Sequence, residues 1–214
     1  MNRQEWLEAR KSGIGASDAA SIIGLNPWKT NVRLWEEKTG FVESEDISDK
    51  PVVKYGNDAE PLLRELFKLD FPQYSVKYDK FKMFHNEEYP FIFATLDGEL
   101  VEKDTGRKGI LEIKTTEIMN SSQWGKWKDG IPQNYYCQCL WQLLATGFDF
   151  VVLRAQIKSN RHQGDDKMKI ETKHYWIEKK DVQSDMDYME ECGVKFWNEN
   201  VLKKVKPNLI LPSI

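Results

Sequence analysis

The stretch Gly109-Ile110-Leu111-Glu112-Ile113-Lys114-Thr115 is an apolar segment that carries one acid and one base. Its aliphatic residues predict a buried strand, and the alternation of a strand places Glu112 and Lys114 on the same face. Another predicted strand ends a hairpin's length upstream. Its end carries an Asp-Gly pair, in the stretch Phe93-Ala94-Thr95-Leu96-Asp97-Gly98-Glu99. Two converging carboxylates can hold a hard divalent cation, and a neighbouring lysine can stabilise or deprotonate a water. This combination is typical of metal-assisted phosphodiester hydrolysis.

The Glu-x-Lys pattern is frequent by chance in a chain that is 30% charged. It starts at four positions, which are Glu36, Glu112, Glu171 and Glu178. Only the copy at Glu112 combines a buried-strand pattern with an Asp-Gly pair upstream. An ordinary surface ion pair is the alternative, and the pattern alone leaves both interpretations open.

Composition limits the protein class. The chain has 214 residues and a formal net charge of −3, so it lacks the overall basicity of many nucleic-acid binders, although a local basic groove remains compatible with it. No apolar run approaches the roughly 20 residues of a membrane span, and the first residues do not resemble a signal peptide. We therefore expect a soluble cytoplasmic protein that does not engage a membrane. Cys137, Cys139 and Cys192 give no even disulfide framework, and Cys137 and Cys139 are expected to be buried reduced thiols.

Hydrophobic periodicity and turn residues predict the elements in order. Helices are expected at 19–23, at 32–38 and after Asp58, where Pro61 lies near the first turn and Leu62, Leu63, Leu66 and Phe67 form the apolar stripe. Later helices are expected from 135 to about 147 and from 180 to 204. Strands are expected at 74–84, 91–101, 109–116, 150–157 and 169–177, with loops at 43–50 and 158–167. This order predicts an α/β (mixed α+β) fold, in which helices flank a central mixed β-sheet in one domain, residues 1–214.

The chain resembles the phage-lambda-type alkaline exonucleases, also called YqaJ-type viral recombinases, within the restriction-endonuclease-like (PD-(D/E)-x-K) nuclease superfamily. The resemblance covers nearly the whole chain. It rests, in order, on Arg10 with Gly13-Ile14-Gly15-Ala16-Ser17-Asp18, Asn26-Pro27-Trp28, Gly56-Asn57-Asp58-Ala59-Glu60-Pro61, Thr95-Leu96-Asp97-Gly98, Leu111-Glu112-Ile113-Lys114, and a helix bearing Gln138 and Gln142. Leu96 stands where the superfamily often has proline, a change that touches no ligand. The resemblance implies a restriction-endonuclease-like fold and a single nuclease domain.

The resemblance also implies a set of metal ligands. Asp97, Glu112 and the backbone carbonyl of Ile113 are expected to bind Mg²⁺. Glu60, expected in the first turn of its helix, would bind a second metal or its water. Two Mg²⁺ ions per site are expected, and Mn²⁺ is expected to substitute. Judged from the residues alone, an acid that complements the helix dipole is the favoured interpretation of Glu60.

Two further catalytic residues follow from the resemblance. Lys114 is expected to orient or deprotonate the attacking water, or to stabilise charge on the phosphorus. Gln138 is expected to hydrogen-bond the water or a phosphate oxygen. Without the resemblance, Gln138 reads as a polar residue on a helix face.

A third group is expected to bind the 5′-terminal phosphate of DNA. A Gly-rich turn that enters a helix exposes backbone N–H groups to an anion, and Arg10 can grip phosphate in a bidentate manner. The resemblance assigns this pocket to Arg10, Ser17 and Thr95. The alternative makes Ser17 an ordinary N-cap and Arg10 an ordinary surface charge.

The expected function is a magnesium-dependent 5′-to-3′ exonuclease. It would degrade one strand of linear double-stranded DNA and leave 3′ tails for phage-type recombination by single-strand annealing. Its expected partners are double-stranded DNA ends, a single-strand annealing recombinase protein and two copies of itself in a homotrimeric ring, in a bacterial or phage-infected cell. The alternatives are a nuclease of the same superfamily with different polarity or substrate, such as a single-strand exonuclease or an endonuclease, or a non-catalytic DNA-end-binding module.

Overall fold

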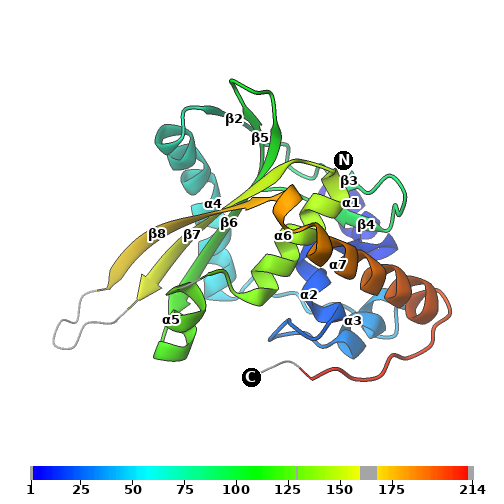
Figure 1. Cartoon of the computed structure of the whole chain (residues 1–214). Coiled ribbons are helices and arrows are strands. Elements are labelled where there is room, and N and C mark those ends of the chain that lie inside the picture. The colour runs from blue at the N-terminus through cyan, green and yellow to red at the C-terminus, as the bar shows by residue number, and fades with distance from the viewer. Residues whose placement is uncertain (1, 129, 160–167, 212–214) are drawn as a thin grey trace.

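The centre of the fold is a five-stranded mixed sheet, seen in a computed structural model that describes residues 2–128, 130–159 and 168–211 (Figure 1). Its strands stand in the order β2 (Tyr74–Lys77), β5 (Gly98–Glu102), β6 (Lys108–Ile118), β7 (Phe150–Ser159) and β8 (Lys169–Glu178). The two long central strands β6 and β7 run parallel, and the other neighbouring pairs are antiparallel. Most of the loop expected at 158–167 lies outside the described residues.

Helices cover both faces of this sheet (Figure 1). On one face, α4 (Pro51–Asp70) packs Leu63 and Phe67 against aliphatic side chains of β6 and β7. On the other face, α6 (Gln133–Thr146) packs against Ile110 of β6 and the opposite side of β7, and α7 (Gln183–Lys195) lies against α6. The predicted mixed sheet between helices is confirmed.

A small second sheet has the order β1 (Ile14–Gly15), β4 (Ile92–Ala94) and β3 (Phe84–His85). The remaining elements are α1 (Arg3–Ala9), η1 (Arg10–Ser12), η2 (Ala16–Asp18), α2 (Ala19–Ile22), α3 (Asn31–Lys38), α5 (Ser121–Lys128), η3 (Lys179–Asp181) and a π-helical segment (Phe196–Val201). In the described ranges, no helix has both the length and the apolar character that a membrane crossing requires. The sequence predicted neither α1 nor α5.

The predicted start of the fourth helix was wrong. α4 begins at Pro51, in the first helical position that suits proline, and runs through Pro61 in its interior. Glu60 therefore lies in the middle of the helix, not in its first turn. The predicted stripe was wrong for two of its members, because Leu62 is 67% exposed and Leu66 is 46% exposed.

Two predicted strands are each divided between the two sheets. The segment expected as one strand at 91–101 forms β4 and then β5, and residues 95–97 carry the chain from the small sheet to the large one. The segment expected at 74–84 likewise separates into β2 and β3. The long C-terminal helix is also interrupted, since α7 ends at Lys195 and continues as a π-helical segment. Cys137 and Cys139 are buried free thiols, as predicted.

Candidate active site

Asp97 and the Glu112–Lys114 pair meet where β5 begins beside β6. Asp97 stands directly before β5, and its Oδ2 accepts a hydrogen bond of 2.8 Å from the backbone N–H of Ile113. Glu112 and Lys114 lie on the face of β6 that is turned toward α6, and Lys114 Nζ is 2.6 Å from Glu112 Oε1. The Glu112 side chain is 2% exposed, so this is a buried ion pair.

Two glutamines of α6 hold the Glu112 carboxylate. Gln138 Nε2 donates to Glu112 Oε1 over 2.6 Å, and Gln142 Nε2 donates to the other oxygen, Oε2. Their spacing of four residues puts both amides on one face of the helix. The sequence predicted a site role for Gln138 but none for Gln142, which is fully buried. The Oε1 atom of Gln142 has no hydrogen-bond partner within the described part of the chain.

Glu60 reaches the same site from the middle of α4. Arg64, one turn later, donates to the Glu60 carboxylate and to the backbone carbonyl of Asp97. The guanidinium of Arg64 also lies 3.6 Å from the centroid of the Tyr78 ring. Arg64 is 6% exposed, and no pattern in the sequence pointed to it. Arg64 therefore connects α4 to the start of β5 through these two hydrogen bonds.

The acids of the site destabilise one another's charged forms. Burial, Glu112 and Glu60 together raise the pKa of Asp97 well above its usual value, in that order of importance. Burial also raises the pKa of Glu60, with Glu112 adding to the rise and Arg64 opposing it. For Lys114, burial lowers the pKa, but Glu112 and Asp97 outweigh it and raise the value above that of a free lysine. Lys114 is therefore an ammonium group here.

The donor set fits a hard divalent cation by its chemistry. Carboxylate and carbonyl oxygens are the ligands that Mg²⁺ prefers. A cation would also favour the ionised forms of Asp97 and Glu60, whose pKa values are raised first by burial and then by neighbouring carboxylates. Among the residues that the structure describes, no three His, Cys, Asp or Glu side chains already converge as a metal cage. Both oxygens of Glu112 are engaged by Lys114 and the two glutamines. Metal binding would thus exchange these contacts for cation contacts.

The N-terminal loop differs from the flexible Gly-rich turn that was expected. Gly13 and Gly15 are buried, and Ile14 between them donates its N–H to the carbonyl of Phe91 over 2.7 Å. A Cβ on Gly13 would lie 2.3 Å from that same carbonyl oxygen. The glycines therefore permit close packing of β1 on β4, and they do not provide mobility.

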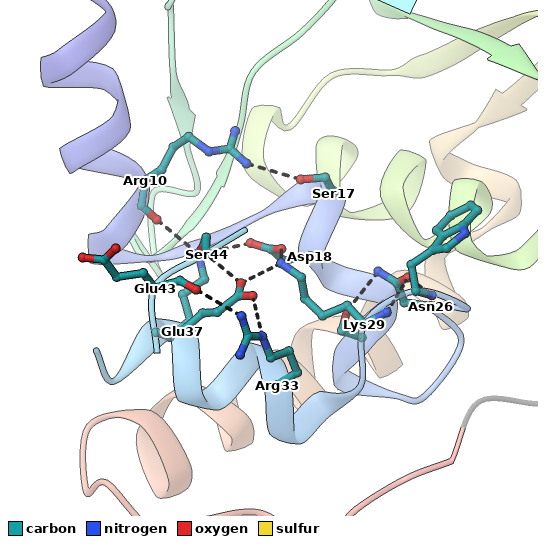
Figure 2. Close-up of polar contacts among 12 residues, drawn as sticks. Arg10, Ser17, Asp18, Asn26, Lys29, Arg33, Glu37, Glu43 and Ser44 are labelled. Carbon is teal, nitrogen blue, oxygen red and sulfur yellow. Dashed lines mark hydrogen bonds and ion pairs between the residues drawn. The ribbon is translucent and has the colours of Figure 1, made fainter. Parts of the chain in front are cut away.

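Arg10 and Ser17, predicted to bind phosphate, are neighbours. Arg10 Nη2 lies 3.4 Å from Ser17 Oγ (Figure 2). The guanidinium of Arg10 also lies 4.6 Å from the centroid of the Trp6 ring. Ser17 is exposed within η2, and the residue that precedes α2 is Asp18, so the N-cap interpretation of Ser17 was wrong. An exposed hydroxyl that accepts from a guanidinium keeps its own proton, so both groups can donate hydrogen bonds to an anion.

A partly buried ion network, absent from the sequence prediction, lies next to this pair. Asp18 accepts from Lys29 at 3.2 Å and from Lys38 at 3.1 Å, and Glu37 binds Lys29 at 2.7 Å and Arg33 at 3.1 Å (Figure 2). Burial alone would raise the pKa of Asp18, but Lys38, Lys29 and the nearby Arg10 lower it to about 2. The network anchors η2 to α3.

One cleft is lined by some of the predicted metal ligands and by one of the residues predicted to bind phosphate. It has a volume of about 500 Å³ and is lined by Trp6, Asn57, Glu60, Pro61, Arg64, Tyr78, Asp79, Lys80, Phe81, Thr95, Leu96 and Asp97. Thr95 and Asp97 stand two residues apart in its wall, and the lining residue Trp6 also contacts the guanidinium of Arg10. The other predicted residues, Glu112, Ile113, Lys114, Gln138, Arg10 and Ser17, are not among the residues that line this cleft.

Comparison with known proteins places these residues in context. The model of the YqaJ-like viral recombinase domain matches residues 5–149, which include the Arg10–Ser17 pair, Glu60, Asp97, Glu112, Lys114 and Gln138. The YqaJ protein of Bacillus subtilis strain 168 is 34% identical over 213 residues, or 98% of this chain. The chain spans 60% of the length of that relative.

Solved structures share the fold. The alkaline exonuclease LHK-Exo from Laribacter hongkongensis has a TM-score of 0.60 at 17% identity, covering 94% of this chain and 96% of that one. The structure of LHK-Exo in complex with dAMP has a TM-score of 0.57 at 16% identity, and the match covers 94% of this chain and 98% of that one. A phage-related exonuclease from Haemophilus somnus 129PT has a TM-score of 0.58 at 14% identity, and the match covers 90% of this chain and 96% of that one. With this fold and with a family match over most of its length, the chain belongs to the YqaJ-like viral recombinase domain family.

Proposed function

We propose that the protein is a magnesium-dependent exonuclease that degrades one strand of linear double-stranded DNA from a 5′-phosphorylated end. One observation carries the proposal. A single cleft has Asp97 and Glu60 in its wall and the Arg10–Trp6 contact at its side, so it offers a place for a scissile phosphate and for a terminal phosphate. A terminal 5′-phosphate differs from an internal one because it carries a second negative charge and has no nucleotide on its 5′ side, so an arginine beside the metal ligands would select a strand end, and this favours an exonuclease.

The residues divide the chemistry among them. Asp97, Glu112, the carbonyl of Ile113 and Glu60 would hold Mg²⁺. When bound, the metal lowers the pKa of a coordinated water and neutralises charge on the phosphate. Lys114, as an ammonium group, orients the water and stabilises negative charge at phosphorus, a role that its raised pKa supports over that of a base. Gln138 donates a hydrogen bond at the same place, where it now contacts Glu112.

The balance of the reaction determines the products. The oxygen of water bonds to the phosphorus that links the first and second nucleotides, and the bond to the 3′-oxygen of the first nucleotide breaks. A 5′-mononucleotide leaves, and the shortened strand again carries a 5′-phosphate. Arg10 and Ser17 can then bind each new end in turn. LHK-Exo, which shares the fold, was crystallised with such a mononucleotide, dAMP.

The biological context is part of the same proposal. The 3′ tails would be substrates for a single-strand annealing protein in the cytoplasm of a bacterial or phage-infected cell. A homotrimeric ring around the duplex would account for processive digestion, and Mn²⁺ would replace Mg²⁺ at the same oxygen ligands. The family to which the chain belongs, a viral recombinase family, supports this setting.

End-labelled DNA tests the function directly. We expect magnesium-dependent release of mononucleotides from 5′-phosphorylated linear duplex, slower release from a 5′-hydroxyl end, and none from closed circular duplex. Lys114→Ala should abolish release, and Lys108→Ala, an exposed lysine at the start of the same strand, should not. Cleavage of the closed circle would identify an endonuclease, and release from the 3′ end first would reverse the polarity.

A further inference from the structure

Phe81 has a backbone conformation that its side chain disfavours. Its φ is +71°, in the left-handed region that glycine and asparagine adopt most readily. Among the described residues the other non-glycine residue with positive φ is Lys204, which follows the C-terminal π-helical segment, where such a conformation commonly ends a helix. Phe81 ends no helix, so its strain calls for a reason in the position of its ring.

The ring of Phe81 lines the cleft of the proposed active site. It lies 5.7 Å from the ring of Trp6, centroid to centroid, at an interplanar angle of 48°. The guanidinium of Arg10 in turn lies over the ring of Trp6. Phe81 is therefore separated from the predicted phosphate-binding arginine by one aromatic ring, and it shares the cleft wall with Asp97.

A nucleotide that spans this cleft must place its base somewhere. Its 5′-phosphate would lie at Arg10 and its 3′-phosphate at Asp97, which leaves the base at the aromatic wall between them. A base sandwiched between two rings needs about twice the stacking distance of 3.4 Å, and the 5.7 Å separation of Trp6 and Phe81 is too small. Because the guanidinium of Arg10 lies over Trp6, the base would stack on Phe81, where it would compete with Lys80 Nζ, which lies 5.2 Å from the centroid of that ring.

We propose that Phe81, supported by Trp6, is a stacking platform for the unpaired base of the 5′-terminal nucleotide. Aromatic platforms accept every base because every base has a π-face, so the subsite would bind without sequence preference. Stacking would also compensate for the loss of the terminal base pair before cleavage. This inference rests on the proposed function, since it assigns a position to the base of that substrate.

Substrates with and without a terminal base provide the test. Initial rates are measured on 5′-phosphorylated duplexes that end in a normal nucleotide or in an abasic residue, with a terminal mismatch to control for base pairing. The wild type should prefer both ends that carry a base, by about five- to a hundredfold. Phe81→Leu, which keeps an apolar side chain but removes the ring, should lose the preference, and Phe81→Tyr should retain it. Tyr188→Leu, at an exposed aromatic on α7, is the matched control.

A second readout needs no turnover. The fluorescence of 2-aminopurine deoxyriboside 5′-monophosphate should be quenched by the wild type and by Phe81→Tyr, and much less by Phe81→Leu. If Phe81→Leu keeps the preference for a base, or slows both ends equally, the platform is refuted while the exonuclease stands. If no DNA is cleaved but the nucleotide is quenched through Phe81, the platform stands and the proposed function fails.

Discussion

Gln142 donates a hydrogen bond from its buried side-chain amide to Oε2 of Glu112, on the carboxylate edge opposite Lys114. The amide fixes the direction in which this carboxylate points. Because a residue that orients a metal ligand commonly contributes ten- to a hundredfold to metal affinity or activity, Gln142 is a positioning residue of the proposed site.

Gln142→Leu should reduce nuclease activity by about ten- to a hundredfold and weaken Mg²⁺ binding to a similar degree. It should also lower the melting temperature, because Oε2 of the buried Glu112 loses its donor, and removal of the buried Oε1 that has no partner among the described residues offsets this loss only in part. Rates across a Mg²⁺ titration measure both effects. Gln133→Leu, at the exposed start of α6, is the control and should behave as wild type. A large fall in melting temperature without a change in Mg²⁺ dependence would make Gln142 a purely structural residue.

Magnesium should raise the melting temperature of the wild-type protein. Burial and the negative charges of Glu112 and Glu60 raise the pKa of Asp97 only in the native state, so a cation that favours the ionised carboxylates stabilises that state alone. Ca²⁺ should give a similar rise without supporting cleavage, because its looser coordination positions the water poorly. Asp97→Asn should remove the response to both ions and raise the melting temperature in chelator. Differential scanning calorimetry in chelator, in Mg²⁺ and in Ca²⁺ measures these melting temperatures. If Mg²⁺ raises the melting temperature of Asp97→Asn as much as that of the wild type, Asp97 is not a ligand.

Acid should weaken the N-terminal region through Asp18. The folded pKa of Asp18 is about 2, below the usual 3.8, so its ionised form stabilises the native state. That contribution is complete above about pH 4 and is lost as the pH falls toward 2. The shift corresponds to about 2 kcal/mol of unfolding free energy. Urea unfolding of the wild type and of Asp18→Asn across this range measures it; the two curves should converge at low pH. Asp49→Asn, at an exposed acid, should follow the wild type.

The sequence predicted the face of β6 that carries Glu112 and Lys114 because strand alternation is a local property of the backbone. It could not predict that residues 91–101 change sheets at Thr95–Asp97, since that depends on pairing with β1 and β6, partners far apart in the chain. Arg64 was missed for a similar reason. In the sequence, Arg64 is one of several charged residues of its helix. Only tertiary packing buries its side chain against Glu60 and the backbone carbonyl of Asp97.

The loss of Arg10 should be most damaging on phosphorylated ends. A hydrogen bond between charged groups contributes about 1.5–3 kcal/mol, so Arg10→Ala should slow digestion of a 5′-phosphorylated duplex by about ten- to a hundredfold or more. The same variant should change little on a 5′-hydroxyl end, which has no terminal phosphate to bind. Ser17→Ala should show the same preference more weakly, and with little loss of stability, since Ser17 does not cap α2.

A variant of the neighbouring Lys11 distinguishes a specific contact between Arg10 and the terminal phosphate from general electrostatic attraction to DNA. Lys11 is exposed and pairs with Glu8 one turn earlier, so Lys11→Ala removes the same charge one residue away. It should slow both substrates slightly and equally, through weaker contact with the DNA backbone. Initial rates on matched 5′-phosphate and 5′-hydroxyl duplexes compare the three variants with wild type. If Arg10→Ala also slows both substrates equally, Arg10 is a backbone contact like any other, and the Arg10–Ser17 pair is no terminal phosphate pocket.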